Sequence, residues 1–207
     1  ESAVMGAEHL IKNPIGNWQR IYGFRYRLDQ IHQIGQVNSA NVPDAFLQPG
    51  SNPQQQALLF GYQISRTDSN NPVNPTKGFK QNYKIQLGSK SVISDANMAI
   101  LNADWGFIYS LGKNADHQFV GRTSLGYIFT DDFDKVPYNL RFFAGGDQSI
   151  RGFDYKSLSP MEFGYKVGGQ GLAIGSLEYN YQFKEGWRAA LFSDFGNAYD
   201  KDFKNDT

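Results

Sequence analysis

The sequence predicts an all-β protein, and more specifically a transmembrane antiparallel β-barrel. Three observations lead to this fold class. Apolar and polar side chains alternate with a period of two in about eight segments, the segments run to about a dozen residues, and the connections between them are alternately short and long. A tilted strand needs about 9–11 residues to cross a bilayer, whereas strands of soluble proteins average about five or six. The segment lengths therefore favour strands that span a membrane.

The composition agrees with a barrel and argues against several other classes. The 207 residues include 22 glycines and 15% aromatic side chains. The sequence holds no apolar run of the roughly 18 residues that a membrane helix needs. The 20 basic and 20 acidic side chains cancel, which argues against a nucleic-acid partner. The absence of cysteine agrees with passage through an oxidising periplasm.

The expected strands lie near residues 3–11, 18–30, 55–67, 78–89, 97–111, 117–130, 171–184 and 187–199. In the second of them Trp18, Tyr22 and Phe24 alternate with polar residues such as Arg25 and Arg27. The later segments repeat the alternation. Their apolar positions are Leu58, Phe60, Tyr62 and Ile64 in the third segment, Phe79, Tyr83, Ile85 and Leu87 in the fourth, and Leu101, Ala103, Trp105, Phe107 and Tyr109 in the fifth. They are Phe119, Leu125, Tyr127 and Phe129 in the sixth, Leu177, Tyr179, Tyr181 and Phe183 in the seventh, and Trp187, Ala189, Leu191 and Phe195 in the eighth.

Each strand is thus expected to have one apolar, aromatic face and one polar face. We expect six aromatic residues to face lipid, namely Phe24, Tyr62, Tyr83, Trp105, Tyr127 and Tyr179. We expect six polar residues to face a wet lumen, namely Arg25, Gln63, Lys84, Asp104, Arg122 and Glu178. Phe192 is an exception, because it falls on the polar face of the last strand. A soluble β-sandwich would show the same alternation, so periodicity alone leaves that alternative open. Aromatic side chains near strand ends, as at Trp18 and Tyr109, favour a membrane interface.

The connections predict which side of the membrane each strand end occupies. Tight turns rich in Gly, Pro and Asn are expected at residues 13–16, 71–78, 112–116 and 184–186, and long loops at 32–53 and 131–170. In bacterial barrels the short turns are periplasmic and the long loops are extracellular.

Residues 141–153 of the second long loop hold the most informative segment. A turn at Gly145, Gly146 and Asp147 precedes the tetrapeptide Ile150-Arg151-Gly152-Phe153. An arginine in a channel lumen would carry a large desolvation cost without a partner, so we expect carboxylates to bind it, ideally in bidentate geometry. Two acids fall on the polar faces of later strands, Glu178 and Asp194. We expect Gly152 to leave room for the loop to press against the wall.

These residues carry a family resemblance. The tetrapeptide 150–153 resembles the [VI]-R-G-[FY] signature of the BamA/TamA outer-membrane barrel superfamily. Residues 192–196 resemble the Phe-x-Asp-x-Gly strand of that family, and residues 71–78 resemble its periplasmic turn. The run that continues to Pro160 is most similar to the TamA branch. The resemblance implies that the loop folds back into the barrel and that its arginine pairs with acids on the inner wall.

The resemblance also implies what surrounds this chain. A TamA-like barrel has sixteen strands with the signature loop between the eleventh and twelfth, so the eight strands here correspond to the sixth to thirteenth. We therefore expect residues 1–207 to form a partial barrel domain, with the periplasmic POTRA domains and the first and last strands outside it. The sequence shows no signal peptide, although an outer-membrane protein needs one.

By the same resemblance, the function expected is outer-membrane translocation and assembly. Such a protein lies in the outer-membrane lipid bilayer and inserts or exports unfolded β-barrel or autotransporter proteins. It works without covalent chemistry or a cofactor and has an inner-membrane-anchored partner of TamB type. Two alternatives remain: a two-partner secretion transporter that exports an unfolded polypeptide, and a passive porin.

Other residues with chemical potential have simpler interpretations. Asp131, Asp132 and Asp134 lack the glycine and terminal glutamate of a calcium loop and are expected to be solvated. His9, His32 and His117 lack the spacing of a zinc site, so no metal is expected. The glycine runs at 145–146 and 168–171 open no predicted helix, so they are interpreted as tight turns rather than phosphate sites. A cation between Glu178 and Asp194 keeps both acids ionised, which suits an ionic lock and not a general acid, so we expect no enzyme activity.

Overall fold

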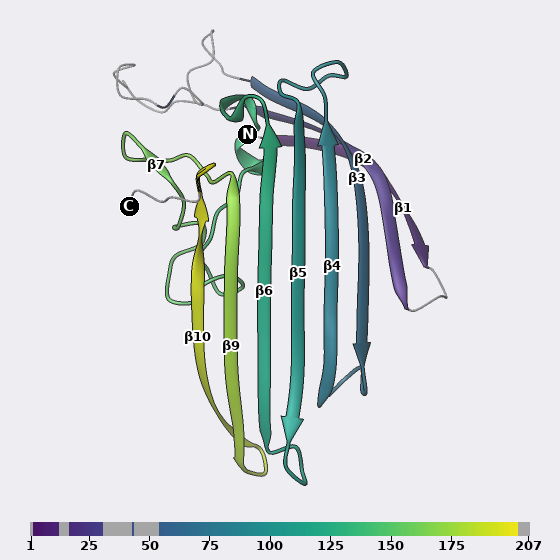
Figure 1. Cartoon of the computed structure of the whole chain (residues 1–207), viewed down its shortest axis with the longest axis vertical. Coiled ribbons are helices and arrows are strands. Elements are labelled where there is room, and N and C mark those ends of the chain that lie inside the picture. Colours follow the sequence, from purple (N-terminus) through teal and green to yellow (C-terminus); the bar gives the residue numbers. More distant parts are fainter. Residues whose placement is uncertain (1, 13–16, 31–42, 44–53, 203–207) are drawn as a thin grey trace.

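The computed structural model describes residues 2–12, 17–30, 43 and 54–202. Figure 1 shows one sheet of long strands standing side by side. Its order is β1-β2-β3-β4-β5-β6-β9-β10, and every neighbouring pair is antiparallel. The strands are β1 (Ser2–Lys12), β2 (Trp18–Gln30), β3 (Gln54–Ser69), β4 (Lys77–Gly88), β5 (Met98–Leu111), β6 (His117–Thr130), β9 (Gly171–Lys184) and β10 (Trp187–Tyr199).

The predicted strands are confirmed, with their ends shifted by a few residues at most. The largest shift is at the end of β3, which continues to Ser69 instead of ending near residue 67. Strand lengths of 11 to 16 residues match those needed to cross a bilayer at a tilt. No helix in the described part of the chain is long and apolar enough to cross a membrane.

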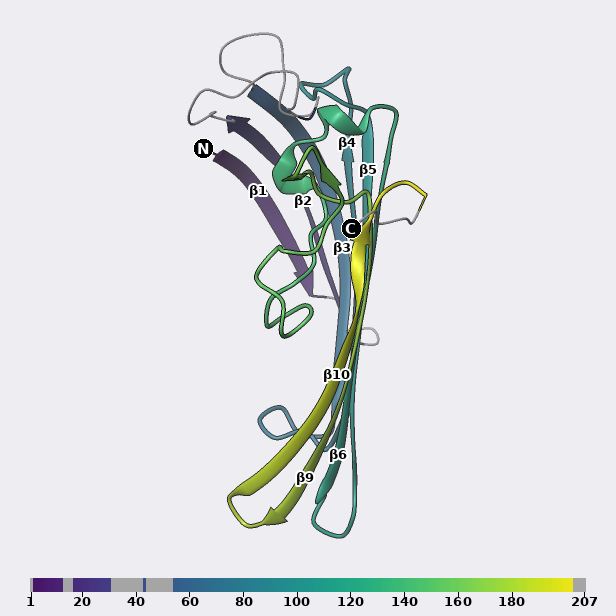
Figure 2. The ribbon, with the colours of Figure 1, turned by 90° about the vertical axis from the view of Figure 1, so that its left-hand side faces the viewer.

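The sheet is open along both of its outer strands. Within the described residues, β1 pairs with β2 alone and β10 pairs with β9 alone. Figure 2 shows that the sheet is curved and that the connection after β6 lies on its concave side, together with the inward-turning β1 and β2. The eight strands therefore form a curved wall and do not close on one another.

The register assigns every paired residue to the convex or the concave face. The twelve residues assigned to the two faces from their alternation lie on opposite sides of the sheet as predicted. Phe24 and Leu125 on the convex side are 56% and 43% exposed, as expected for side chains that meet lipid. On the concave side Gln63 donates to Asn82 at 2.7 Å, and Asn82 donates to Asp104 at 2.9 Å. Polar groups on that face thus bind one another across strands.

The concave face is not polar along its whole length, which corrects the expectation of a uniformly wet face. At the end near the long loop, apolar residues of β3, β5 and β6 point inward and form a buried cluster with Val136 and Phe142 of the loop. The strand members are Ala57, Leu59, Met98, Ile100 and Ile128, together with Ala198 of β10. The alternation missed them because a loop folded onto this face supplies apolar surface against which inward side chains can be buried.

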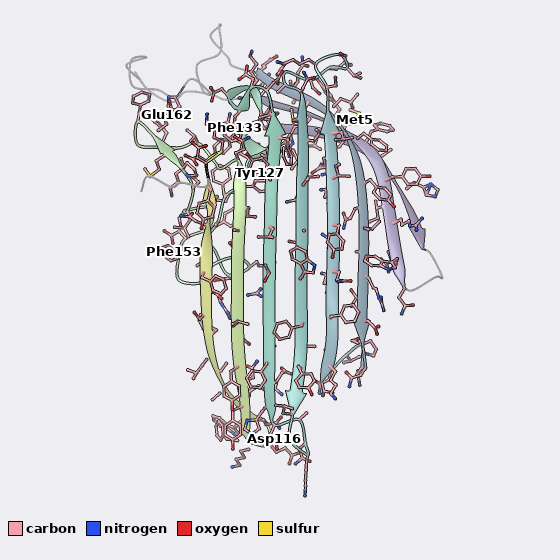
Figure 3. All side chains as sticks on the ribbon, in the orientation of Figure 1. Met5, Asp116, Tyr127, Phe133, Phe153 and Glu162 are labelled. Carbon is pink, nitrogen blue, oxygen red and sulfur yellow. The ribbon has the colours of Figure 1, made fainter. Side chains whose placement is uncertain are left out.

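The loop between β6 and β9 spans residues 131–170 and contains four short elements. These are the 3₁₀ turns η3 (Phe133–Lys135) and η4 (Tyr138–Leu140) and the two-residue strands β7 (Met161–Glu162) and β8 (Tyr165–Lys166), which pair with each other. Figure 3 labels Phe133 near one end of the sheet and Asp116 at the opposite end, in the β5–β6 turn. The loop begins at the end of the wall that the sequence assigns to the extracellular side.

The predicted tight turn at 71–78 owes its shape to side-chain capping by two asparagines. Asn71 Oδ1 accepts hydrogen bonds from the backbone N–H groups of Val73 and Asn74 at 2.9 and 3.1 Å. Asn70 Oδ1 accepts hydrogen bonds from the backbone N–H groups of Thr76 and Lys77, both at 3.0 Å. These bonds close the turn directly before β4. The predicted turn at 13–16 and all of the predicted loop at 32–53 except Pro43 lie outside the described residues.

Candidate functional site

Two adjacent strands and the long loop bring the predicted site residues together. In the β9–β10 register, Ser176 lies opposite Asp194 and Glu178 lies opposite Phe192. These four side chains form a compact block on the concave face, because residues two apart on a strand share a face. The loop places Arg151 over this block. Ile150, the preceding residue, is 4% exposed and fixes the segment by its burial.

Arg151 makes a dense set of hydrogen bonds to the wall. Its Nε and Nη2 atoms donate to Oδ2 and Oδ1 of Asp194, both at 2.8 Å, which is bidentate geometry. Its backbone N–H also donates to Asp194 Oδ2, at 2.9 Å. Nη1 donates to Glu178 Oε2 at 2.7 Å, and Nη2 donates to Ser176 Oγ at 3.1 Å. The structure therefore brings Arg151, Glu178 and Asp194 into direct contact.

Phe192 completes the binding site for the guanidinium group. The Cζ atom of Arg151 lies 3.7 Å from the centroid of the Phe192 ring, a close cation–π contact. This contact explains why an aromatic residue interrupts the polar face of β10. The only feature of the sequence that pointed to Phe192 is the break it makes in the alternation of β10, two residues before Asp194. Ser176 had no such signal, since its position opposite Asp194 follows from the register alone.

The charges of the site are balanced by several neighbours. Hydrogen bonds from Arg151 to Asp194 and then to Glu178 raise the pKa of the Arg151 guanidinium above its usual value. Asn180 donates to the second oxygen of Glu178 at 3.0 Å. Arg122 on β6 donates to Ser176 Oγ at 3.5 Å and adds a second positive charge beside the two acids. The side chain of Asp194 is 3% exposed, so its negative charge depends on these partners.

The Gly145–Gly146 turn shapes the loop before it reaches the wall. Gly145 and Gly146 have φ angles of +101° and +100°, which L side chains rarely adopt. A Cβ atom at Gly145 would also collide with the carbonyl oxygen of Asp154. The turn is closed by hydrogen bonds from Gly146 N to Phe153 O and from Ser149 N to Gly146 O, both at 2.9 Å. Asp147 is exposed at its apex.

Gly152 differs from the expectation that it provides room against the wall. No atom lies within 4 Å of the Cβ position at Gly152, so crowding does not require glycine there. Its φ angle of +89° does require it, because that angle reverses the chain directly after Arg151. Phe153, the next residue, is 53% exposed, and Figure 3 labels it at the height of the middle part of β10.

Two of the three loop aspartates pair with separate lysines. Asp131 binds Lys90 at 3.0 Å, and Asp132 binds Lys135 at 2.7 Å. The hydrogen bond from Lys90 is the main cause that lowers the pKa of Asp131. Among the described residues, no group of three or more His, Asp or Glu side chains converges as metal ligands. His9 and His117 each contact a tyrosine hydroxyl, and His32 lies outside the described residues.

Comparison with known proteins identifies the family and the fold of this chain. Residues 4–207 match the Omp85 superfamily domain. The chain is 28% identical over 191 residues to the outer membrane protein assembly factor BamA of Nitratidesulfovibrio vulgaris (strain Hildenborough), an alignment that covers 90% of this chain and 23% of that protein. The crystal structure of BamA from Haemophilus ducreyi lacking POTRA domains 1–3 has the same fold. It matches 97% of this chain and 42% of that chain, with a TM-score of 0.77 and 18% identity.

Proposed function

This chain belongs to the Omp85 superfamily, whose members lie in the bacterial outer membrane, and on that premise we propose that it is part of a protein that inserts or exports other proteins. The observation that carries the proposal is the contact of Arg151 with Asp194 and Glu178, which ties a long loop to the inner wall. We name this contact the loop lock. A passive pore needs no such ionic contact to hold an arginine-bearing loop against its wall.

We propose a non-covalent mechanism for this activity. The loop lock holds residues 145–158 against β9 and β10, so the geometry of that wall depends on whether the lock is closed. Charge-assisted hydrogen bonds contribute about 1.5–3 kcal/mol each when they are shielded from water. The side chains of Arg151 and Glu178 are 21% and 27% exposed, so the energy of their pair is reduced by solvent screening. A lock of this strength can open when a substrate or partner binds.

Within the superfamily, we propose the TamA branch. The support is the run from Tyr155 to Pro160, which is most similar to that branch, together with the Gly145-Gly146-Asp147-Gln148-Ser149 context before the tetrapeptide. A TamA-type protein would use an inner-membrane-anchored partner of TamB type and would act on unfolded outer-membrane or autotransporter proteins. Because the chain spans 23% of the BamA relative, we propose that residues 1–207 are a partial barrel domain. Periplasmic POTRA domains and further strands would complete the protein.

We further propose that the protein is not an enzyme. The two carboxylates that could have formed a catalytic pair are both bound to one guanidinium group. A carboxylic acid that must donate a proton cannot keep that proton beside a bound arginine. The pair therefore serves binding and not proton transfer.

The deciding experiment measures substrate assembly by the full-length protein in lipid vesicles. Arg151→Ala is expected to abolish most assembly of an unfolded outer-membrane substrate, while the variant itself still folds and inserts. The matched control is Lys166→Ala, which removes an exposed cation from the same loop. Wild-type assembly by the Arg151→Ala variant would disprove the role of the loop lock. Export of an unfolded polypeptide without its insertion would instead favour a two-partner secretion transporter, and ion conductance alone would favour a porin.

A further inference from the structure

The loop that carries Arg151 contacts the wall in two separate regions. We call residues 133–142 together with 167–170 the neck, and residues 145–158 the tip. Figure 3 shows Phe133 of the neck at the end of the sheet, whereas Phe153 of the tip lies farther along β10. The loop lock holds the tip. The neck is held by a different arginine and by a different kind of partner.

Arg141 is the centre of the neck. It is 5% exposed, and its donors go to backbone carbonyl groups. Nε donates to Val136 O at 3.0 Å, Nη1 donates to Val167 O at 3.0 Å, and Nη2 donates to Phe133 O and Asp134 O at 3.0 and 2.9 Å. Its Cζ atom also lies 4.5 Å from the centroid of the Phe133 ring. One guanidinium group thus joins the outgoing and the returning chain of the loop.

Burial lowers the pKa of Arg141 to about 10, so the side chain stays charged at neutral pH. A buried charge is retained only where its hydrogen bonds are satisfied, and four carbonyl oxygens accept them here. The bond to Val167 is the one that closes the loop at its base. Phe142 and Gly169 add a backbone bridge at the same place.

Gln55 attaches the neck to the wall. This β3 side chain is fully buried, and its Oε1 accepts a hydrogen bond from the backbone N–H of Tyr138 at 3.0 Å. Its Nε2 donates to Asp134 O at 3.4 Å. β3 is separated from β6, where the loop begins, by β4 and β5. The neck therefore reaches across the concave side to a distant strand.

Apolar burial strengthens the same attachment. Val136 of the neck is fully buried, and Phe142 is 9% exposed. Both belong to the cluster that includes Leu59 and Ile128 of the wall. The Phe142 ring also lies over Gly126 of β6, where a Cβ atom would come within 2.5 Å of it. These contacts do not involve the loop lock.

We propose that the neck and the tip are anchored independently. Gln55 is the positioning residue that keeps the neck on the wall when Arg151 leaves its two acids, and Arg141 is the positioning residue that keeps the outgoing and returning chains of the neck together. The loop then opens by movement of the tip about a fixed base. The biological role of the loop lock rests on the proposed function. The independence of the two anchors rests only on the contacts described above. It can be tested without a substrate.

The two anchors differ in their response to salt. The tip is held by ion pairs whose members Arg151 and Glu178 are partly exposed, so salt screens them. The neck is held by buried backbone carbonyl groups, a buried amide and apolar contacts, on which salt has little effect. A rise in ionic strength is therefore expected to loosen the tip before the neck.

The experiment uses pulsed electron spin resonance on the full-length protein in lipid vesicles. These 207 residues contain no native cysteine, so spin labels can be placed at introduced sites. A reference label at Asn114, exposed in the β5–β6 turn, is paired either with Asn139 in the neck or with Gln148 in the tip. Arg151→Ala and high salt are each expected to broaden the tip distance distribution at least twofold and to leave the neck distribution unchanged.

Substitutions in the neck are expected to broaden the neck distance distribution instead of the tip distribution. Arg141→Met and the milder Gln55→Leu are expected to broaden the neck distribution, and Arg141→Lys is expected to restore it only in part, because an ammonium group cannot reach four carbonyls at once. Gln55→Leu keeps the test valid if Arg141→Met does not fold. Broadening of the neck in Arg151→Ala, or an unchanged neck in both Arg141→Met and Gln55→Leu, would overturn the proposal. A failed assembly assay with these distances intact would count against the proposed function alone.

Discussion

Arg151 stacks on Phe192 with its Cζ atom 3.7 Å from the ring centroid, while the edges of the guanidinium group bind Asp194 and Glu178. The ring supports one flat face of the cation, and the carboxylates hold its donors in the plane. This combination restricts both the position and the rotation of the side chain. A lysine cannot reproduce it, since an ammonium group has no flat face and no fork of donors.

The first prediction concerns Phe192. Phe192→Ala removes the stacking surface and leaves the carboxylates in place, so the loop lock is expected to weaken by about 0.5–2 kcal/mol and not to disappear. Hydrogen exchange of the tip peptide, followed by mass spectrometry, measures the effect. Phe192→Tyr keeps the ring and is the matched control. Equal protection of the tip in the alanine variant and in the wild type would contradict a role for the ring.

The two acids are expected to contribute unequally. Asp194 accepts three hydrogen bonds from Arg151, including one from its backbone N–H, whereas Glu178 accepts one. Asp194→Asn is therefore expected to cost about 1.5 kcal/mol or more, which corresponds to roughly tenfold faster exchange of the Arg151 amide. Glu178→Gln is expected to produce a smaller change in the same measurement. The reverse order of the two variants would show that the bidentate pair is not the main contact.

Glycine substitutions separate backbone conformation from crowding. Gly145→Ala meets both a positive φ angle and the Asp154 carbonyl group, so it is expected to distort the turn and expose the tip to protease. Gly152→Ala meets only the positive φ angle, which costs about 1–2 kcal/mol. Gly152→Asn is expected to be tolerated better than Gly152→Ala, because asparagine adopts positive φ more readily. Limited proteolysis of the three variants in vesicles compares them directly, and equal cleavage of both alanine variants would refute the distinction.

Low pH is expected to break the ion pairs of Asp131 and Asp132 at the start of the loop between β6 and β9. Hydrogen bonds from Lys90 and Lys135 lower the pKa of Asp131 and Asp132 below their ordinary value of 3.8. A carboxylate whose pKa is lowered in the folded state stabilises that state above its ordinary pKa and loses this effect as the pH falls through the lowered value. The contacts of residues 131 and 132 are therefore expected to persist at neutral pH and to be lost below about pH 3.8. Hydrogen exchange of residues 130–136, corrected for intrinsic rates, measures this loss, and a loss near pH 6 would contradict the assignment.

The sequence by itself determined the strands, their faces and the candidate arginine. These are local properties, because a pleated strand turns alternate side chains to opposite faces whatever its neighbours are. The same alternation put Glu178 and Asp194 on the polar face and marked Phe192 as an exception. The capped turn at 71–78 could also be predicted, since its asparagines bind backbone groups a few residues away.

Only the tertiary structure decided which side chains meet across the wall. Ser176 faces Asp194 because of the β9–β10 register, and Gln55 binds the neck because the loop path brings residues about 80 positions apart into contact. The inward apolar residues near the loop follow from that same path, as does the open space beside Gly152. Such contacts depend on long-range packing, in which no single residue carries a local preference for its partner. The sequence therefore contains the parts of the lock, and the fold of the loop over the sheet sets how they are anchored.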